Sequence, residues 1–157
     1  MKGDNHMYIK FDAKSINESV ARMTVAAFMM HMNPTLDEIQ DVKTAVSEAV
    51  TNAIIHGYPE TDLVNSKEGE CSEKNEIEMI CAQEDETLKI TIIDKGVGIE
   101  NVEEARKPFF TSKPDEERSG MGFAFMETFM DVLDVESRVG KGTKVTMIKY
   151  IERKDEQ

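Results

Sequence analysis

Cysteine is scarce in this sequence, and its two copies form no recognisable motif. Cys71 and Cys81 lie ten residues apart, which matches no common spacing of metal ligands. Because disulfides persist mainly in oxidising compartments, this usage favours reduced thiols in a cytosolic protein.

A targeting signal and a membrane span are also missing from the pattern. Residues 1–7 are polar and lack the apolar core of a signal peptide. No apolar run approaches the ~20 residues that a membrane helix requires. We therefore expect a cytoplasmic chain without a membrane partner.

Positive charge is in deficit. The chain carries 31 acidic against 19 basic residues, a formal net charge of −12. Such a surface repels both a phosphate backbone and anionic lipid headgroups. We therefore expect no direct contact with nucleic acid, and a protein partner with a basic patch fits the charge better.

The composition is that of a soluble globular domain. Apolar residues make up 39% and charged residues 32% of the 157 residues. This length suits one domain over residues 1–157, large enough to form a core without disulfides or metals. Glycine and proline occur at single points rather than in tracts, and no internal repeat is present.

Two capping boxes predict the first two helices. Ser15 to Glu18 begins a helix with an apolar stripe that we expect to be buried, and Thr35 to Glu38 begins one that runs to His56. The stripe of the first helix is Ile16, Val20, Met23, Ala27 and Met30. The inward face of the second is Ile39, Val42, Val46, Ala49, Val50 and Ala53.

Alternating and β-branched segments predict strands, and a third helical pattern follows Gly122. The predicted strands cover residues 8–11, 76–83, 87–94, 132–138 and 143–150. Strands that mostly neighbour one another in sequence indicate a mixed, largely antiparallel sheet with helices on one face. The expected fold is therefore an α+β two-layer sandwich.

The second helix carries two polar residues that the fold does not require. Glu48 and Asn52 are four residues apart and project from the same face, away from the apolar stripe. Taken alone, the pair is typical of a solvated helix face.

Glycine-rich turns follow in the second half of the chain. Asp94-Lys-Gly96-Val-Gly98 comes directly after an apolar strand, where a carboxylate can accept a hydrogen bond from an amine and glycines let the backbone approach a ligand. Ser119-Gly-Met-Gly122 precedes a helix, whose free amides favour a phosphate. Gly140-Lys-Gly142-Thr143 adds a hydroxyl before the last strand. The first and last segments are equally compatible with plain turns.

These motifs do not belong to the common nucleotide-binding classes. The sequence has no P-loop, no Rossmann fingerprint and no protein-kinase signature of the Gly-rich-loop and H-R-D type. In order, however, E-x-x-x-N, D-x-G-x-G, G-x-G and G-x-G-T resemble the four nucleotide-binding boxes of the GHKL superfamily, which includes gyrase, Hsp90-type chaperones, histidine kinases and MutL-type ATPases.

A closer resemblance covers about residues 11–146. Residues 17–22, 47–58 and 94–127 resemble the sporulation anti-sigma F factors of endospore-forming bacteria. The resemblance is weakest at both ends and over residues 60–75, which are longer and more acidic than expected for that family. We interpret 60–75 as a surface insertion without a catalytic role.

The resemblance implies that Mg-ATP, or ADP, lies between the helices and the sheet. Glu48 then matches the general base that takes the proton of an attacking serine hydroxyl. Asn52 matches the Mg²⁺ ligand. Asp94 matches the residue that binds the adenine amine, with Thr143 nearby.

Further positions follow from the same resemblance. Gly96 and Gly98 would keep the adenine pocket open, and Arg106 would approach the terminal phosphate. Arg22 falls where the first helix meets protein partners, whereas His56 is expected to be structural or at the pocket edge. Within and after an ATP lid over 107–119, the expected phosphate-binding residues are Thr111, Ser119, Gly120, Met121 and Gly122.

The resemblance also implies a partner switch. A homodimer with ATP holds sigma factor F, an anti-anti-sigma factor competes for the complex, and the kinase inactivates that competitor by phosphorylating a serine. Alternatives are a GHKL ATPase that only hydrolyses ATP, a histidine kinase fragment, a nucleotide-dependent sequestering module and a kinase serving a stress sigma factor. No coupling domain is expected after the last strand, and no histidine begins a helical hairpin.

Overall fold

The structure, a computed structural model, describes residues 4–59, 75–107 and 122–152. The predicted insertion at 60–75 and the predicted lid at 107–119 lie almost entirely outside the described residues. The elements in chain order are β1 (Asn5–Asp12), α1 (Ile16–Met29), η1 (Met30–Met32), α2 (Leu36–Asn52), η2 (Ala53–Gly57), β2 (Glu76–Glu84), β3 (Thr87–Asp94), α4 (Val102–Ala105), α5 (Gly122–Phe129), β4 (Val132–Arg138) and β5 (Gly142–Tyr150).

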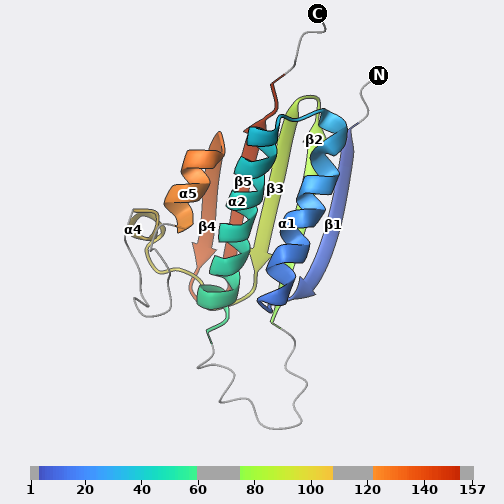
Figure 1. Cartoon of the computed structure of the whole chain (residues 1–157). Helices are drawn as coiled ribbons and strands as arrows, with labels where there is room; N and C mark the ends of the chain where they lie inside the picture. The colour runs from blue at the N-terminus through green and yellow to red at the C-terminus, as the bar shows by residue number, and fades with distance from the viewer. Residues whose placement is uncertain (1–3, 60–74, 108–121, 153–157) are drawn as a thin grey trace, which may run out of the picture.

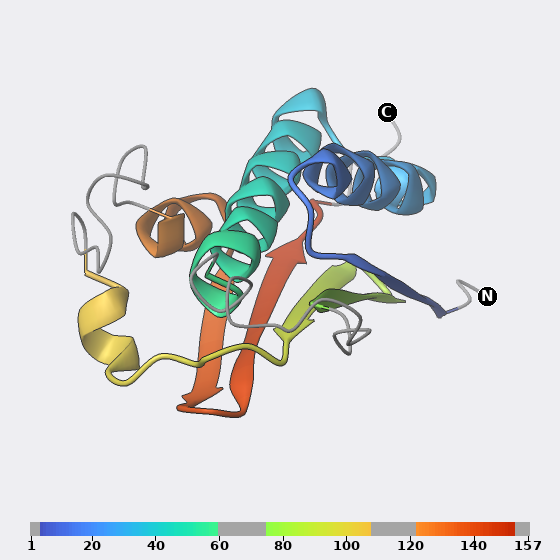
Figure 2. The same ribbon diagram turned by 90° about the horizontal axis from the view of Figure 1, so that it is seen from below.

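The strands form one sheet in the order β1-β2-β3-β5-β4 (Figure 1). Every described pair of neighbouring strands is antiparallel, so the sheet has none of the parallel pairing that a mixed sheet would contain. Helices α1, α2 and α5 cover one face of this sheet (Figure 2). The predicted α+β two-layer architecture is confirmed, and the strand boundaries agree closely, except that β1 is longer than expected.

Helix α2 lies in the centre of the helix layer, between α1 and α5 (Figure 1). Its capping box is present: the Glu38 amide donates to Thr35 Oγ1 at 3.0 Å, and the Thr35 amide donates to Glu38 Oε1 at 2.8 Å. Five small and β-branched residues form its buried face: Val42, Ala45, Val46, Ala49 and Val50. The predicted inward face is therefore confirmed.

Helix α1 presents the opposite face to the one expected. The predicted stripe faces solvent, with exposed fractions of 74% for Ile16, 52% for Val20 and 57% for both Met23 and Met30. The buried residues are Ala21, Val25, Phe28 and Met29. Because α1 is apolar on two opposite faces, its periodicity alone could not say which face meets the sheet.

The capping box predicted at Ser15 is also wrong. Ser15 has helical backbone angles, φ −53° and ψ −33°, and its side chain makes no capping bond. A side-chain cap requires an N-cap residue with an extended backbone conformation. Thr35 has this conformation, whereas Ser15 does not. Instead, Asn17 Nδ2 donates to the Asp12 carbonyl at 2.9 Å and ties the start of α1 to β1.

The C-terminal end of α2 widens into one π-helical turn, η2. This turn brings Gly57 down to the segment after β3, where the Val97 amide donates to the Gly57 carbonyl at 2.9 Å. Such single π-turns within helices are frequent at functional sites. Here the turn fixes the distance between α2 and the end of β3.

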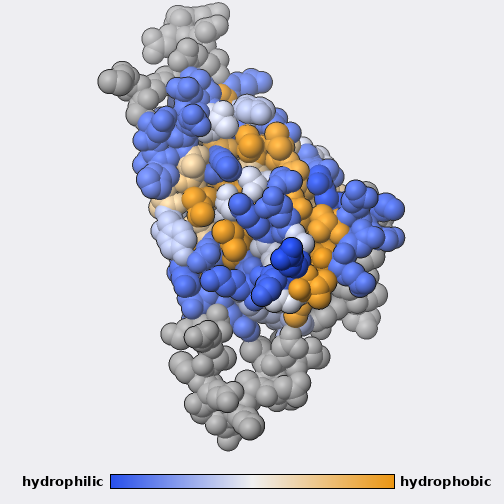
Figure 3. Space-filling view, turned by 180° about the vertical axis from the view of Figure 1, so that it is seen from behind, coloured by the Kyte–Doolittle hydropathy of each residue, from blue (hydrophilic) through white to orange (hydrophobic). Residues whose placement is uncertain are grey.

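The face of the sheet opposite the helices combines apolar and hydrophilic groups (Figure 3). On this side Tyr8 is 53% exposed, and its hydroxyl donates to Glu78 Oε1 at 2.7 Å. In the parts of the chain that the structure describes, no helix has the length and apolar character needed to cross a membrane.

Candidate functional site

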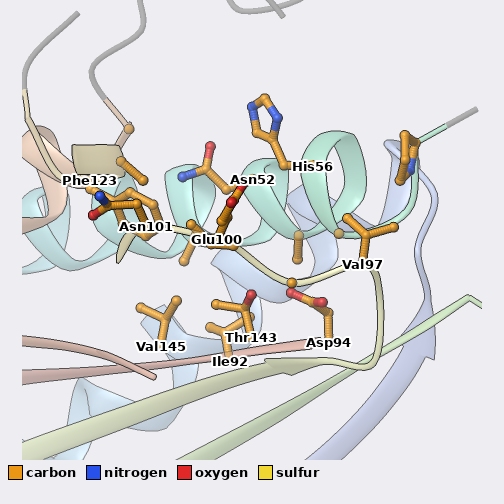
Figure 4. Close-up of a pocket in the computed structure, with 18 of the residues that line it drawn as sticks. Asn52, His56, Ile92, Asp94, Val97, Glu100, Asn101, Phe123, Thr143 and Val145 are labelled. Carbon is orange, nitrogen blue, oxygen red and sulfur yellow. The ribbon is translucent and has the colours of Figure 1, made fainter. Parts of the chain in front are cut away.

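A cavity of about 790 Å³ lies between the C-terminal end of α2, the adjacent ends of β3 and β5, and the segment from Val97 to Ala105 (Figure 4). Its size suits a small-molecule ligand. Apolar walls and a few polar groups line it. The lining residues include Asn52, His56, Ile92, Asp94, Val97, Gly98, Asn101, Gly122, Phe123, Thr143 and Val145.

Asp94 provides a buried carboxylate at the sheet end of the cavity. It is the last residue of β3, is 6% exposed and accepts the Gly96 amide at 3.0 Å. Burial raises the pKa of Asp94 to about 6, although backbone amides of Gly96 and Thr143 act in the opposite direction. Above about pH 6 the cavity therefore contains an ionised acceptor that is largely buried.

Thr143 lies directly opposite Asp94 in the β3–β5 register. It is 9% exposed, and both residues line the cavity. In Figure 4 the two side chains lie beneath α2, on neighbouring strands. Two separate sequence motifs predicted these residues, and the antiparallel register brings them together.

Two glycines allow a close contact between η2 and the turn after β3. A Cβ on Gly96 would lie 1.8 Å from the Gly57 carbonyl oxygen, and one on Gly57 would lie 2.8 Å from Asp94 Oδ1. Gly98, at φ +77°, lines the cavity, whereas Gly96 is not among the lining residues. The contact of Gly96 with Gly57 gives a physical reason for glycine at 96 that does not involve the open pocket.

Gly96→Ala is expected to lower the free energy of unfolding by about 3 kcal/mol, because a backbone carbonyl cannot move aside as a side chain can. Urea denaturation would measure the change. Gly140→Ala is the matched control: Gly140 has φ +79° but nothing within 4 Å of its Cβ position. It should cost about 1 kcal/mol through backbone strain alone. Equal costs at the two positions would contradict the contact explanation.

The tyrosine after η2 joins three segments around the same end of the site. The Tyr58 hydroxyl donates to the Glu76 carbonyl at 2.7 Å and accepts the Lys95 amide at 2.7 Å. It therefore connects the end of η2, the start of β2 and the turn after Asp94. This role of Tyr58 was not predicted from the sequence, because its partners are backbone groups from distant segments.

Asn52 meets the start of α5 at the opposite end of the cavity. A Cβ on Gly122 would lie 2.7 Å from Asn52 Nδ2, so glycine at 122 lets the Asn52 amide approach the start of α5 without moving. An amide oxygen beside the free N–H groups of a helix start can serve a cation and an anion together. Within the described ranges, no cluster of three His, Cys, Asp or Glu side chains could hold a metal ion.

Glu48 lies one helical turn before Asn52 on α2 and is half-buried. It is not among the residues that line the cavity, whereas Asn52 is. The predicted role of Glu48 as a base therefore stays a prediction.

The two predicted arginines are both paired within the chain. Arg106 Nη2 contacts Glu127 Oε1 at 2.6 Å and the Leu133 carbonyl at 3.4 Å, and Arg106 does not line the cavity. Arg22 forms an ion pair with Glu18 at 3.5 Å. A phosphate-binding role for Arg106 would require it to leave Glu127, and both predicted roles remain predictions.

Other predicted and unpredicted positions complete the site. Four predicted phosphate-binding residues lie outside the described residues: Thr111, Ser119, Gly120 and Met121. His56 lines the cavity, in agreement with a pocket-edge position. The lining residues Val97, Asn101 and Phe123 were not predicted. Asn101 caps α4, since its side-chain oxygen accepts the Glu104 amide at 3.1 Å. The sequence pattern N-x-x-E at residues 101–104 could have predicted this cap.

Comparison with known proteins is consistent with this geometry. The family model described as "Histidine kinase-like ATPase domain" matches residues 11–149. An anti-sigma F factor of Clostridium acetobutylicum is 55% identical over 93% of this chain and 94% of its own length. One from Anoxybacillus flavithermus is 53% identical over 94% and 93%.

Among solved structures, the RsbU and RsbW domains of Rv1364c from Mycobacterium tuberculosis superpose with a TM-score of 0.65 and 20% identity. The match covers 96% of this chain and 33% of that one, so this chain spans about a third of its length, and the likeness concerns the fold alone. The sequence relatives establish the family as well as the fold, because they are identical to this chain at more than half of the aligned positions over nearly their whole length. The chain therefore belongs to the anti-sigma F factors, within the histidine kinase-like ATPase domain family.

Proposed function

We propose that this chain binds Mg-ATP in the cavity, holds sigma factor F inactive and phosphorylates a serine of an anti-anti-sigma factor. The observation that carries the proposal is the buried Asp94–Thr143 pair at one end of the cavity, with Asn52 against Gly122 at the other. Membership of the anti-sigma F factors supports sigma factor F over a stress sigma factor as the partner.

The two ends of the cavity suit the two ends of a nucleotide. The Asp94 carboxylate can accept from an adenine amine, and Ile92, Val97 and Val145 offer apolar walls to the base. Asn52 can contribute its amide oxygen to Mg²⁺, which prefers oxygen ligands and keeps several waters. The amides at the start of α5 can face phosphate oxygens.

The proposed chemistry needs little from the protein beyond positioning and one proton acceptor. Bound Mg-ATP would supply the transferable phosphoryl group. Glu48, one turn from Asn52, would take the proton of the incoming serine hydroxyl. Arg106, released from Glu127, would bring a guanidinium to the transferred charge.

The homodimer in this proposal is supported by the exposed stripe of α1. Ile16, Val20 and Met23 are each more than half exposed on one helix face, and contiguous apolar surface of this kind marks interaction sites. Arg22 lies on the same helix and can pair with carboxylates of a partner. We propose that α1 serves self-association and partner recognition.

Val20→Glu is expected to convert a dimer into a monomer, because a charge in an apolar interface loses its solvation without gaining a partner. Light scattering on purified protein at micromolar concentration would report the mass. Val139→Glu, at a 64% exposed residue of the β4–β5 turn, is the matched control and should leave the mass unchanged. A dimer that persists in Val20→Glu would exclude α1 as the interface.

The proposed activity is tested by mixing the protein with γ-labelled Mg-ATP and its candidate anti-anti-sigma factor. Acid-stable label on a serine of that partner would support the kinase. Label released as free phosphate would instead indicate an ATPase. Tight binding without turnover would indicate a sequestering module that uses the nucleotide structurally.

A further inference from the structure

Ser137 of β4 lies behind the cavity and was not part of any motif. Its Oγ is 2.7 Å from the Ile99 amide nitrogen, 3.0 Å from the Gly142 carbonyl oxygen and 2.8 Å from Thr143 Oγ1. It therefore joins the segment after Gly98 to the start of β5. Ser137 is half-buried and pairs with Thr143 in the β4–β5 register.

The chemistry of these three partners fixes the direction of each bond. A serine hydroxyl has one proton to donate and two lone pairs that accept. The Gly142 carbonyl can only accept, so it takes the Ser137 proton, and the Ile99 amide can only donate. The remaining lone pair of Ser137 must then accept the proton of the Thr143 hydroxyl.

This proton arrangement determines what Thr143 offers to the cavity. With its proton directed at Ser137, the Thr143 oxygen presents only lone pairs to a ligand. Asp94, opposite Thr143, is likewise only an acceptor when ionised. The sheet end of the cavity is thus a pair of acceptors, which suits an amino group with two N–H bonds and disfavours a carbonyl oxygen.

We propose that Ser137 is a positioning residue that makes the site select a 6-amino purine over a 6-keto purine by orienting the Thr143 hydroxyl. The inference rests on the proposed nucleotide function. Without Ser137, the Thr143 hydroxyl rotates and donates to a keto oxygen, so discrimination between the two purines weakens. Ser137 itself does not line the cavity.

The test compares the dissociation constants of ATP and inosine triphosphate in the presence of Mg²⁺, measured by calorimetry at about pH 8, well above the ordinary carboxyl range. Wild-type protein is expected to bind ATP more tightly. In Ser137→Ala the preference should fall by about 5- to 10-fold, the value of one hydrogen bond. Ser137→Thr keeps the hydroxyl and should retain the preference. Ser19→Ala, which removes a hydroxyl that bonds to the Ile16 carbonyl within α1, is the control.

The results separate a failure of the Ser137 proposal from a failure of the proposed nucleotide function. A Ser137→Ala variant that binds both nucleotides more weakly but with an unchanged ratio would show a merely structural role and overturn the inference. Equal affinities in the wild type would overturn it as well. Should Ser137→Ala not fold, Thr143→Val removes the same acceptor, and an unchanged ratio there would be equally decisive. If wild-type protein bound neither nucleotide, the proposed function itself would fail.

Discussion

Glu48→Ala is expected to reduce phosphotransfer by roughly 10²-fold or more while leaving nucleotide affinity almost unchanged, the effect of removing a general base. Glu48 lies outside the cavity lining, so its loss removes no wall of the ligand site. Asn52→Ala should behave in the opposite way and weaken Mg-ATP binding, because Asn52 lines the cavity.

Two measurements separate these effects. Titration with a fluorescent ATP analogue gives the affinity, and a single-turnover assay with labelled ATP gives the rate of transfer to the partner protein. Asp37→Asn is the matched control, since Asp37 is an exposed carboxylate in the first turn of the same helix. Normal transfer by Glu48→Ala would refute the proposed base.

Asp94→Asn is expected to reduce ATP affinity by roughly 10- to 100-fold, because it removes a charged hydrogen-bond acceptor from a buried site. The same change should stabilise the unliganded protein. Burial raises the pKa of Asp94 from 3.8 to about 6, so the ionised side chain costs the folded state on the order of 2–3 kcal/mol above about pH 6.

The sign of this second effect follows from the two protonation states. Above pH 6 the carboxyl is ionised in both folded and unfolded chains, and the folded state bears the full desolvation cost. As the pH falls from 6 towards 4, the folded chain takes up its proton first and the cost disappears. The gain in unfolding free energy of Asp94→Asn should therefore be present at pH 8 and vanish near pH 4.

Chemical denaturation at both pH values would measure the gain. Asp134→Asn, at an exposed carboxylate of β4, should change neither stability nor ATP affinity. A loss of stability at pH 8 in Asp94→Asn would mean that the bonds to the carboxylate outweigh its burial. The opposing effects on binding and stability would identify a residue retained for function.

Sequence patterns predict well those parts of the fold that depend on interactions between residues close together in the chain. The five strands alternate or follow apolar runs, and α2 begins at a capping box whose bonds are present. The order of the motifs predicted a nucleotide site, and the structure brings Asp94, Thr143, Asn52 and Gly122 to one cavity. Asn52 and Asp94 end α2 and β3, whereas Gly122 and Thr143 lie at the start of α5 and β5, so all four lie at ends of elements.

Other features depend on tertiary contacts that no local pattern contains. Helix α1 has two apolar faces, and packing against the sheet decides between them. The π-turn η2 carries no sequence signal of its own, and its last carbonyl, at Gly57, accepts the amide of the distant Val97. Ser137 and Tyr58 form hydrogen bonds with backbone groups that are distant in sequence. Only the tertiary fold brings these groups close to the two side chains.

The bond between Tyr58 and Glu76 has a consequence for the length of the intervening chain. It joins Tyr58 and Glu76, the two residues that flank positions 59–75. Once these points are tied, lengthening the connection adds only a closure entropy that grows with the logarithm of its length, about 0.6 kcal/mol for each doubling. The domain can therefore accept inserted sequence here while Asp94 and its turn keep their geometry.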